Sequence, residues 1–280
     1  MPTGIDVSVA SVARVYDYLL GGKDNFKVDR DTADAMLAID PSSRAMTINN
    51  RRFLQRAVRT LAQEYGITQF LDHGSGLPTQ DNVHQIAQSV HPEARVVYVD
   101  NDPIVLAHGR ALLADNASTT VISADVRDTD ALMAHPDVVK LLDFDRPVGA
   151  LFVSLLHSIP DRDDPGALLR RVVDRLAPGS FIAVSHLVSL DAEIREQRTA
   201  FALEAHAGQW GRVRTPEEVT AFIESAGVDI LAPGLCEVSQ WRPDGSDGPV
   251  QESTDWFEFG GVARKDPHCF CRGFGGEGQV

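Results

Sequence analysis

The sequence predicts a doubly wound α/β domain, in which helices cover both faces of a mostly parallel sheet. Two observations lead to this prediction. Segments such as "RVVYVD" (95–100) and "ALFVSLL" (150–156) are almost continuously apolar, which is typical of strands buried on both faces. Strand-like segments of this kind alternate five times with segments of helical periodicity, and that alternation is characteristic of parallel sheets built from strand–helix–strand units.

The predicted elements follow one another in a regular order. Apolar residues at helical spacing predict helices at 8–20 and 29–65, joined by "GGKDNF" (21–26). The next strands are expected at 68–73, 95–100, 119–125, 147–156 and 179–187, with helices at about 80–90, from Pro103, within 129–142, at 164–177, at 190–208 and at 215–226. Two last strands are expected near 229–240 and 254–265, on either side of the turn-rich "RPDGSDGPV".

Composition restricts the partners of the protein. The chain has 280 residues and a formal net charge of −14, and such a negative field repels nucleic-acid phosphates. The arginines of "NNRRFLQRAVRT" (49–60) fall at several helical angles, so we interpret them as a solvated helix face. No apolar run approaches the roughly 20 residues that cross a bilayer, and the N-terminus lacks a signal-peptide pattern. We therefore expect neither a nucleic-acid nor a membrane partner.

The cysteines and histidines indicate neither disulfides nor a metal. Cys236, Cys269 and Cys271 are too few for a disulfide framework, which favours a reduced, cytoplasmic setting. The segment "HCFC" (268–271) contains soft metal ligands, but it does not supply a set of four. No metal is predicted, and the protein is expected to be a monomer or a homodimer.

A glycine-rich turn after the first predicted strand marks the expected ligand site. In "FLDHGSGLPT" (70–79), Gly74 and Gly76 permit backbone angles and a close approach that a side chain would block. Asp100 ends the next strand, 24 residues beyond Gly76, where it is placed to accept hydrogen bonds from ribose hydroxyls. These features suit a nicotinamide dinucleotide and S-adenosylmethionine equally well.

Three details favour S-adenosylmethionine. The dinucleotide pattern has a third glycine where Thr79 stands, and Pro78 has no amide hydrogen to donate to a pyrophosphate. Asp72 would repel a pyrophosphate but suits the cationic methionine end of S-adenosylmethionine. Asp125, at the end of the third strand, is placed to accept from an adenine amino group. Each acid alone is equally well explained as a helix N-cap, so the prediction depends on the ordered set.

At this point the chain resembles a class I S-adenosylmethionine-dependent methyltransferase, and more narrowly an actinobacterial family of such proteins formerly of unknown function. The resemblance extends over roughly residues 8 to 265. The motifs that carry it are "RVYDYLLGGKDNF" (14–26), "NRRFLQRAV" (50–58), "FLDHGSGLPTQDNVH" (70–84), "VVYVDNDPIVLAHGRALL" (96–113), "SADVRD" (123–128), "LLHSIPD" (155–161), "RLAPGSFIAVSH" (175–186) and "WRPD" (241–244). His73 departs from the family pattern, which has an aliphatic residue there.

The resemblance implies a Rossmann-like sheet of seven strands, the last one antiparallel and inserted beside its neighbours. It also implies a set of cofactor contacts, which we transfer residue by residue. Gly74, Ser75 and Gly76 would bind the amino-acid end of the cofactor, Asp100 the ribose, Asn101, Asp125 and the backbone of Val126 the adenine, and Ser154 and Leu155 the side near the sulfonium.

The segment before the first strand is expected to form a helical lid. We divide the chain into an N-terminal helical segment (1–66), a methyltransferase core (67–266) and a flexible tail (267–280). In the lid, Gly22 would lie at the cofactor mouth, Tyr16 or Tyr18 would hydrogen-bond the cofactor carboxylate, and Lys23 or Arg51 would pair with it. The alternative is that Gly21 and Gly22 merely end a helix and that the tyrosines pack on the core.

The predicted function is methyl transfer to a small molecule. A base is needed only when the acceptor must lose a proton, and His157, after the fourth strand, is the expected candidate. The alternative from another class is a protein that binds S-adenosylmethionine without transferring its methyl group, as a sensor or partner subunit.

Overall fold

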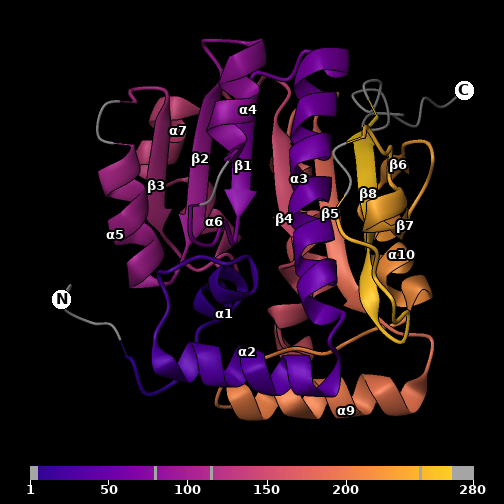
Figure 1. Ribbon diagram of the computed structural model, residues 1–280. Helices are drawn as coiled ribbons and strands as arrows, with labels where there is room; N and C mark the ends of the chain where they lie inside the picture. The colour runs from indigo at the N-terminus through magenta and orange to yellow at the C-terminus, as the bar shows by residue number, and fades with distance from the viewer. Residues whose placement is uncertain (1–5, 79–80, 114–115, 246–247, 267–280) are drawn as a thin grey trace, which may run out of the picture.

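One eight-stranded sheet lies at the centre of the protein (Figure 1). The computed structural model describes residues 6–78, 81–113, 116–245 and 248–266. The strands are β1 (Gln69–His73), β2 (Arg95–Asp100), β3 (Thr119–Ser123), β4 (Gly149–Val153), β5 (Phe181–Val188), β6 (Val228–Ile230), β7 (Cys236–Glu237) and β8 (Phe257–Lys265). Their order is β3-β2-β1-β4-β5-β8-β6, and the short β7 pairs with β8 outside this path.

The strand directions confirm the predicted doubly wound, Rossmann-like fold. β1 to β5 pair in parallel, whereas β8 runs antiparallel to both β5 and β6, between which it is inserted. The main path therefore has the seven strands that the resemblance implied, and β7 adds two residues to them. β1 and β5 are buried along their whole length, as expected for apolar strands covered on both faces.

Helices cover the two faces of the sheet and enclose separate apolar cores. On one face, α3 and α4 contribute Phe53 and Val83 to a core with Phe70 of β1. On the other face, α7 and α8 contribute Val138 and Leu168. The helices are α1 (Val12–Leu19), α2 (Lys27–Ile39), α3 (Ser43–Tyr65), α4 (Val83–Val90), α5 (Pro103–Leu112), α6 (Thr129–Met133), α7 (Pro136–Leu141), α8 (Pro165–Arg175), α9 (Ala192–Ala205) and α10 (Pro216–Ser225). None of them, within the described residues, has the length and hydropathy of a membrane span.

Prolines explain two differences from the predicted elements. The single helix expected at 29–65 is two helices, because Asp40 precedes Pro41 and a residue before proline is disfavoured in the helical region. The strand expected at 229–240 is likewise divided into β6 and β7 around Pro233, which has no amide hydrogen for the ladder. The predicted tail, 267–280, lies outside the described residues.

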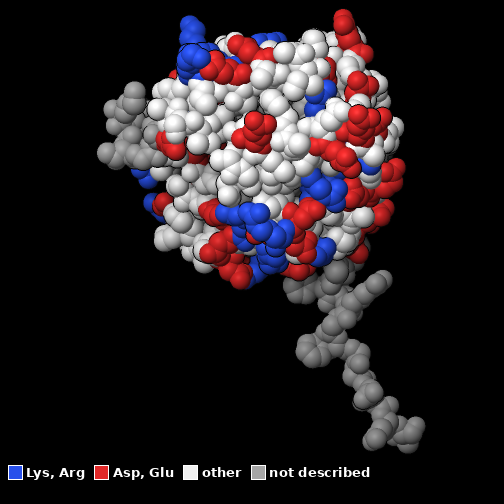
Figure 2. Space-filling model, turned by 90° about the horizontal axis from the view of Figure 1, so that it is seen from below, with Lys and Arg blue, Asp and Glu red and all other residues white. Residues whose placement is uncertain are grey.

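Three helices lie across the carboxyl ends of the parallel strands. In Figure 1, α1 lies below the tips of β1 and β2, and α2 and α9 cross the bottom of the molecule. Figure 2 shows this end of the molecule, where Lys and Arg lie next to Asp and Glu and much of the middle is uncharged. The N-terminal segment is therefore packed over the edge of the sheet where ligands of such folds bind.

We expect Phe53→Ala to destabilise the protein strongly. The Phe53 side chain is completely buried, and its ring meets the ring of Trp241 edge-on, with centroids 5.5 Å apart. Truncation of such a side chain leaves a cavity and costs about 3–5 kcal/mol of unfolding free energy. Urea denaturation measures the loss. The control is Leu190→Ala at a residue that is 74% exposed, which should change stability by less than about 0.5 kcal/mol. Equal midpoints for the two variants would contradict this view of the core.

Candidate functional site

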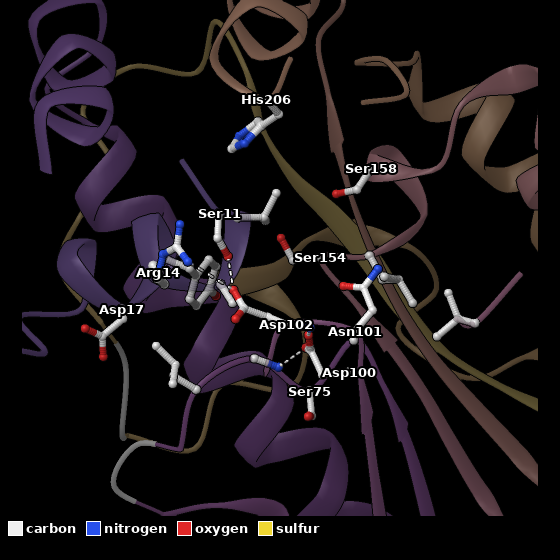
Figure 3. Close-up of a pocket in the computed structure, with 18 of the residues that line it drawn as sticks. Ser11, Arg14, Asp17, Ser75, Asp100, Asn101, Asp102, Ser154, Ser158 and His206 are labelled. Carbon is white, nitrogen blue, oxygen red and sulfur yellow. Dashed lines mark hydrogen bonds and ion pairs between the residues drawn. The ribbon is translucent and has the colours of Figure 1, made fainter. Parts of the chain in front are cut away.

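A cavity of about 640 Å³ opens at the carboxyl ends of the parallel strands (Figure 3). The strand order reverses at β1, which lies between β2 and β4, and ligands of doubly wound sheets bind at such a reversal. The walls come from the turn after β1, the ends of β2, β3 and β4, the N-terminal segment with α1, and residues 206–209 after α9. The volume is typical of small-molecule sites, which measure roughly 300–1,000 Å³.

The glycine turn after β1 presents its backbone to this cavity. Gly74 and Gly76 have φ angles of +68° and +66°, which side chains rarely adopt. A Cβ on Gly74 would also lie only 2.6 Å from a methyl carbon of Leu155. The hydroxyl of Ser75, which lines the cavity, is buried without a hydrogen-bond partner among the described residues. The turn therefore offers a close backbone approach to a ligand.

Asp100 braces the glycine turn as well as facing the cavity. Its Oδ2 accepts a hydrogen bond from the Gly76 amide (2.8 Å) and its Oδ1 accepts one from the Asp102 amide (2.9 Å). Burial raises the pKa of Asp100 despite these bonds. Because a carboxylate has about four lone-pair directions, both oxygens can still accept from ligand hydroxyls. Asn101, which follows, also lines the cavity.

Asp72 is a buried carboxylate without a hydrogen-bond donor among the described residues. It lines the cavity at 3% exposure, and no described residue donates a hydrogen bond to it. Burial raises its pKa to about 7, the charge of Arg51 opposes this rise, and the charge of Asp100 adds to it. A cationic group bound in the cavity would supply the missing partner and favour the ionised form.

The third predicted acid, Asp125, already has a partner. Its two oxygens accept from the guanidinium of Arg127, which also contacts Asp163. These hydrogen bonds lower the pKa of Asp125, so its carboxylate stays ionised. Asp125 and Val126 both line the cavity, and so do Ser154 and Leu155 after β4.

The N-terminal segment is fastened over the cavity by buried polar contacts. Arg14 forms an ion pair with Asp29 of α2 (2.9 Å) and lies 3.8 Å from Asp102 at the start of α5. The Ser11 hydroxyl also donates to Asp102, a contact that Figure 3 marks with a dashed line. α1 is thus tied to the loop that carries Asp100.

Three residues expected in the lid, Gly22, Lys23 and Tyr18, do not line the cavity. Gly22 lies in a turn that is held by the Asp17 carboxylate, which accepts hydrogen bonds from the Asp24 amide (2.9 Å) and from Asn25 Nδ2 (2.8 Å). A Cβ on Gly22 would lie 1.9 Å from Asp17 Oδ1, so Gly22 serves the turn rather than the cavity. Lys23 is exposed, and the Tyr18 hydroxyl donates to Asp34. Gly22, Lys23 and Tyr18 are all absent from the described lining, whereas Arg51 belongs to it.

Tyr16 lines the cavity, but its hydroxyl is engaged within the protein. It donates to the carbonyl of Thr47 (3.1 Å) and accepts from Asn50 Nδ2 (3.0 Å). A carbonyl oxygen can only accept, so the proton of Tyr16 is not available to a cofactor carboxylate. Of the residues expected at that carboxylate, Arg51 is the cation that the structure brings to the cavity.

A chain of hydrogen bonds continues from Asn50 behind the cavity wall. Ser185 Oγ donates to Asn50 Oδ1 (2.7 Å) and accepts from the Ser154 amide (2.9 Å). Ser154 Oγ in turn donates to Glu258 Oε1 (2.6 Å), and burial raises the pKa of Glu258 to about 7. This chain fixes Ser154, which has a φ of +57°, at the cavity edge.

The structure does not bring His157 to the cavity. It is 2% exposed, its Nδ1 accepts from the Leu187 amide (3.1 Å), and burial lowers its pKa to about 3. The ring is neutral at neutral pH and lies behind the wall, where it has no contact with a ligand in the cavity. His73 is also buried outside the lining, stacked on Phe152 at 4.2 Å between ring centroids.

Some lining residues were missed by the sequence reasoning. Arg14 and Asp17 belong to the quoted motif "RVYDYLLGGKDNF". The partners of Arg14, Asp29 of α2 and Asp102 before α5, lie outside the motif, whereas Asp17 binds Asp24 and Asn25 within it. His206 follows α9 and lines the cavity, although nothing near it in sequence indicates a site. No group of three metal-ligating side chains occurs within the part of the chain that the structure describes.

Known proteins resemble this chain over most of its length. The family described as S-adenosyl methyltransferase matches residues 1–266. A protein from Thermobifida fusca YX, whose crystal structure is known, is 43% identical in sequence. The match covers 95% of this chain and 98% of that chain, with a TM-score of 0.83. A DUF574 family protein from Streptomyces avermitilis MA-4680 is 39% identical, with 93% and 99% covered and a TM-score of 0.84. No curated protein matches the chain.

We expect Asp72→Asn to stabilise the unliganded protein at alkaline pH. Folding raises the pKa of Asp72 from 3.8 to about 7, so the folded state holds this proton more tightly than the unfolded chain. The resulting stabilisation is complete below about pH 4 and is lost as pH rises through 7, above which a buried charge opposes folding.

Urea denaturation at pH 8 and pH 4 tests this expectation. The unfolding free energy of the variant should exceed that of the wild type by a few kcal/mol at pH 8, because each pKa unit corresponds to about 1.4 kcal/mol. At pH 4 the two unfolding free energies should differ little. The control is Asp174→Asn on the exposed side of α8, which should leave the pH dependence unchanged. A variant less stable than the wild type at pH 8 would show that the ionised Asp72 is stabilised by partners within the protein.

Proposed function

Because this chain belongs to the S-adenosyl methyltransferase family, we propose that it transfers a methyl group from S-adenosylmethionine to a small molecule bound in the same cavity. S-adenosylmethionine supplies a methyl carbon that is activated by positively charged sulfur. The observation that carries the proposal is the buried carboxylate of Asp72, to which no described residue donates a hydrogen bond and which lies in a cavity at the strand-order reversal.

The proposed contacts divide the cofactor among the strand tips. Asp72 would bind the α-ammonium group and Arg51 the carboxylate, while the backbone of the glycine turn and the Ser75 hydroxyl approach the same end. Asp100 would accept from the ribose hydroxyls. The adenine would lie against Asn101, Asp125 and Val126, where Arg127 keeps the Asp125 carboxylate ionised and fixed. These assignments are supported by burial, free acceptor capacity and position along the cavity.

The rest of the cavity suits a small acceptor. Its lining includes Val9, Ile159, Pro160 and Ala207, apolar residues from three separate segments. The N-terminal segment, fastened through Ser11 and Arg14, forms part of the same wall. A cavity of this volume fits a compact molecule better than an extended polymer. The main task of these residues is to hold the acceptor atom in line with the methyl carbon.

We expect Asp100→Asn to weaken binding of S-adenosylhomocysteine, the demethylated product. The amide keeps the size of the side chain but loses one acceptor oxygen and the charge. Hydrogen bonds to charged groups contribute about 1.5–3 kcal/mol, so the dissociation constant should rise about 10- to 150-fold in titration calorimetry. Asp174→Asn is the matched control and should bind as the wild type does.

Three outcomes, two from these titrations and one from a methyl-transfer assay, are informative. No heat with either S-adenosylmethionine or S-adenosylhomocysteine would contradict the proposed cofactor site. Equal affinities for Asp100→Asn and wild type would contradict the role of Asp100. Tight binding without transfer of a labelled methyl group to any compound of a broad panel would favour the non-catalytic, sensor alternative.

A further inference from the structure

His206 places an imidazole at the end of the cavity opposite the glycine turn. It follows the last residue of α9, and its ring stacks on Trp210 with 5.3 Å between centroids and 19° between planes. In Figure 3, His206 lies on the far side of the cavity from Ser75 and Asp100. The ring is therefore on the side that the proposed cofactor contacts leave to the acceptor.

The hydrogen bonding of His206 determines which nitrogen carries a proton. Its Nδ1 lies 3.0 Å from the carbonyl oxygen of Ala10. A carbonyl oxygen only accepts, so Nδ1 must donate and the lone pair of the neutral ring is on Nε2. Within the described residues, Nε2 has no hydrogen-bond partner and is not fully buried, and His206 lines the cavity. Burial lowers the pKa of His206, although the Ala10 contact and Asp29 oppose this, so the ring is neutral at neutral pH.

The same N-terminal segment that covers the cavity holds Ala10 in place. Arg14 Nη2 donates to the carbonyl of Val9 (2.7 Å) and to that of Asp6 (3.2 Å), and Arg14 itself is fixed by Asp29. Ala10 is 5% exposed and packs against Val15 and Ala33. The carbonyl that orients His206 thus belongs to a rigid part of the lid.

We propose that His206 is the general base of this methyltransferase and that the acceptor carries a phenol-like hydroxyl. The inference rests on the proposed function, since it needs the cofactor at the opposite end of the cavity. The ordinary pKa of a phenol is about 10 and that of an alkylammonium group about 10.4. Proton transfer from either group to histidine is therefore unfavourable in free energy.

The charges that result favour the phenol. Proton transfer from a phenol leaves a phenolate beside an imidazolium, and their attraction in a poorly solvated cavity recovers much of the cost. Transfer from an ammonium group leaves a neutral amine beside the imidazolium, with no such attraction. Aliphatic hydroxyls, with pKa values near that of water at about 15.7, are too weakly acidic for this base. The apolar walls at Val9, Ile159 and Pro160 also suit an aromatic ring.

The step balances without any further reactant. The proton of the hydroxyl goes to Nε2 of His206, and the oxygen forms a bond to the methyl carbon as the carbon–sulfur bond breaks. The products are a methyl ether, S-adenosylhomocysteine and an imidazolium, which returns its proton to solvent.

The test uses the full chain, labelled S-adenosylmethionine and four probes: catechol, 4-nitrophenol, benzyl alcohol and benzylamine. We expect methylation of the two phenols only. His206→Ala should reduce it by about 100-fold or more, since general bases contribute about 10²–10⁴. Added imidazole should restore part of the loss, which a purely structural role would not allow. S-adenosylhomocysteine affinity, measured by calorimetry, should not change.

A second readout does not require turnover. With S-adenosylhomocysteine bound, 4-nitrophenol should be more ionised in the wild-type cavity than in His206→Ala, as its absorbance reports. His108→Gln is the matched control, because this half-exposed histidine of α5 is not part of the described lining. It should behave as the wild type in every measurement.

The contrary results separate the two proposals. Absence of calorimetric heat with S-adenosylhomocysteine would mean that the proposed function fails. Three other results, each with cofactor binding intact, would overturn only the inference about His206 and its acceptor. They are methylation of benzylamine or benzyl alcohol alone, no transfer to either phenol, and undiminished phenol methylation by His206→Ala.

Discussion

Two carboxylates buried on neighbouring strands of one sheet edge are the constraint on which this structure depends. Burial raises the pKa of both carboxyls, the charge of Asp100 adds to the rise at Asp72, and Asp72 has no hydrogen-bond donor among the described residues. A fold built only for stability would place apolar side chains there. The arrangement is favourable once a ligand supplies an ammonium group and hydroxyls, so the free energy lost in the unliganded protein becomes part of the binding free energy.

The N-terminal segment connects this cofactor edge to the acceptor side. Arg14, paired with Asp29, fixes the carbonyls of residues 6 and 9, while Ser11 and Arg14 both contact Asp102 beside Asp100. One end of the segment therefore reaches the loop proposed for ribose, and the neighbouring carbonyl of Ala10 orients His206. In the proposed mechanism, this one segment therefore helps to position both substrates, although it adds no strand to the sheet.

The sequence predicted the fold well because apolar strands and their order are local signals. The acids at the strand tips were found for the same reason, since the carboxyl ends of parallel strands meet at one edge. The base that we propose was not predicted. His157 follows β4 as an active-site residue would, but its ring points into the protein, and His206 comes near the cavity only through the path of α9. The partners of Tyr16 and Asp17 likewise depend on packing between helices, which periodicity does not reveal.

Proton release on cofactor binding tests the central claim most directly. A carboxyl with a pKa of about 7 is partly protonated at neutral pH and must ionise to pair with an ammonium group. Calorimetric titration of S-adenosylhomocysteine at pH 7, in buffers of different ionisation enthalpy, measures the protons exchanged. The account predicts release of a substantial fraction of a proton by the wild type and much less by Asp72→Asn. Binding without proton release, or equal release by both proteins, would contradict it.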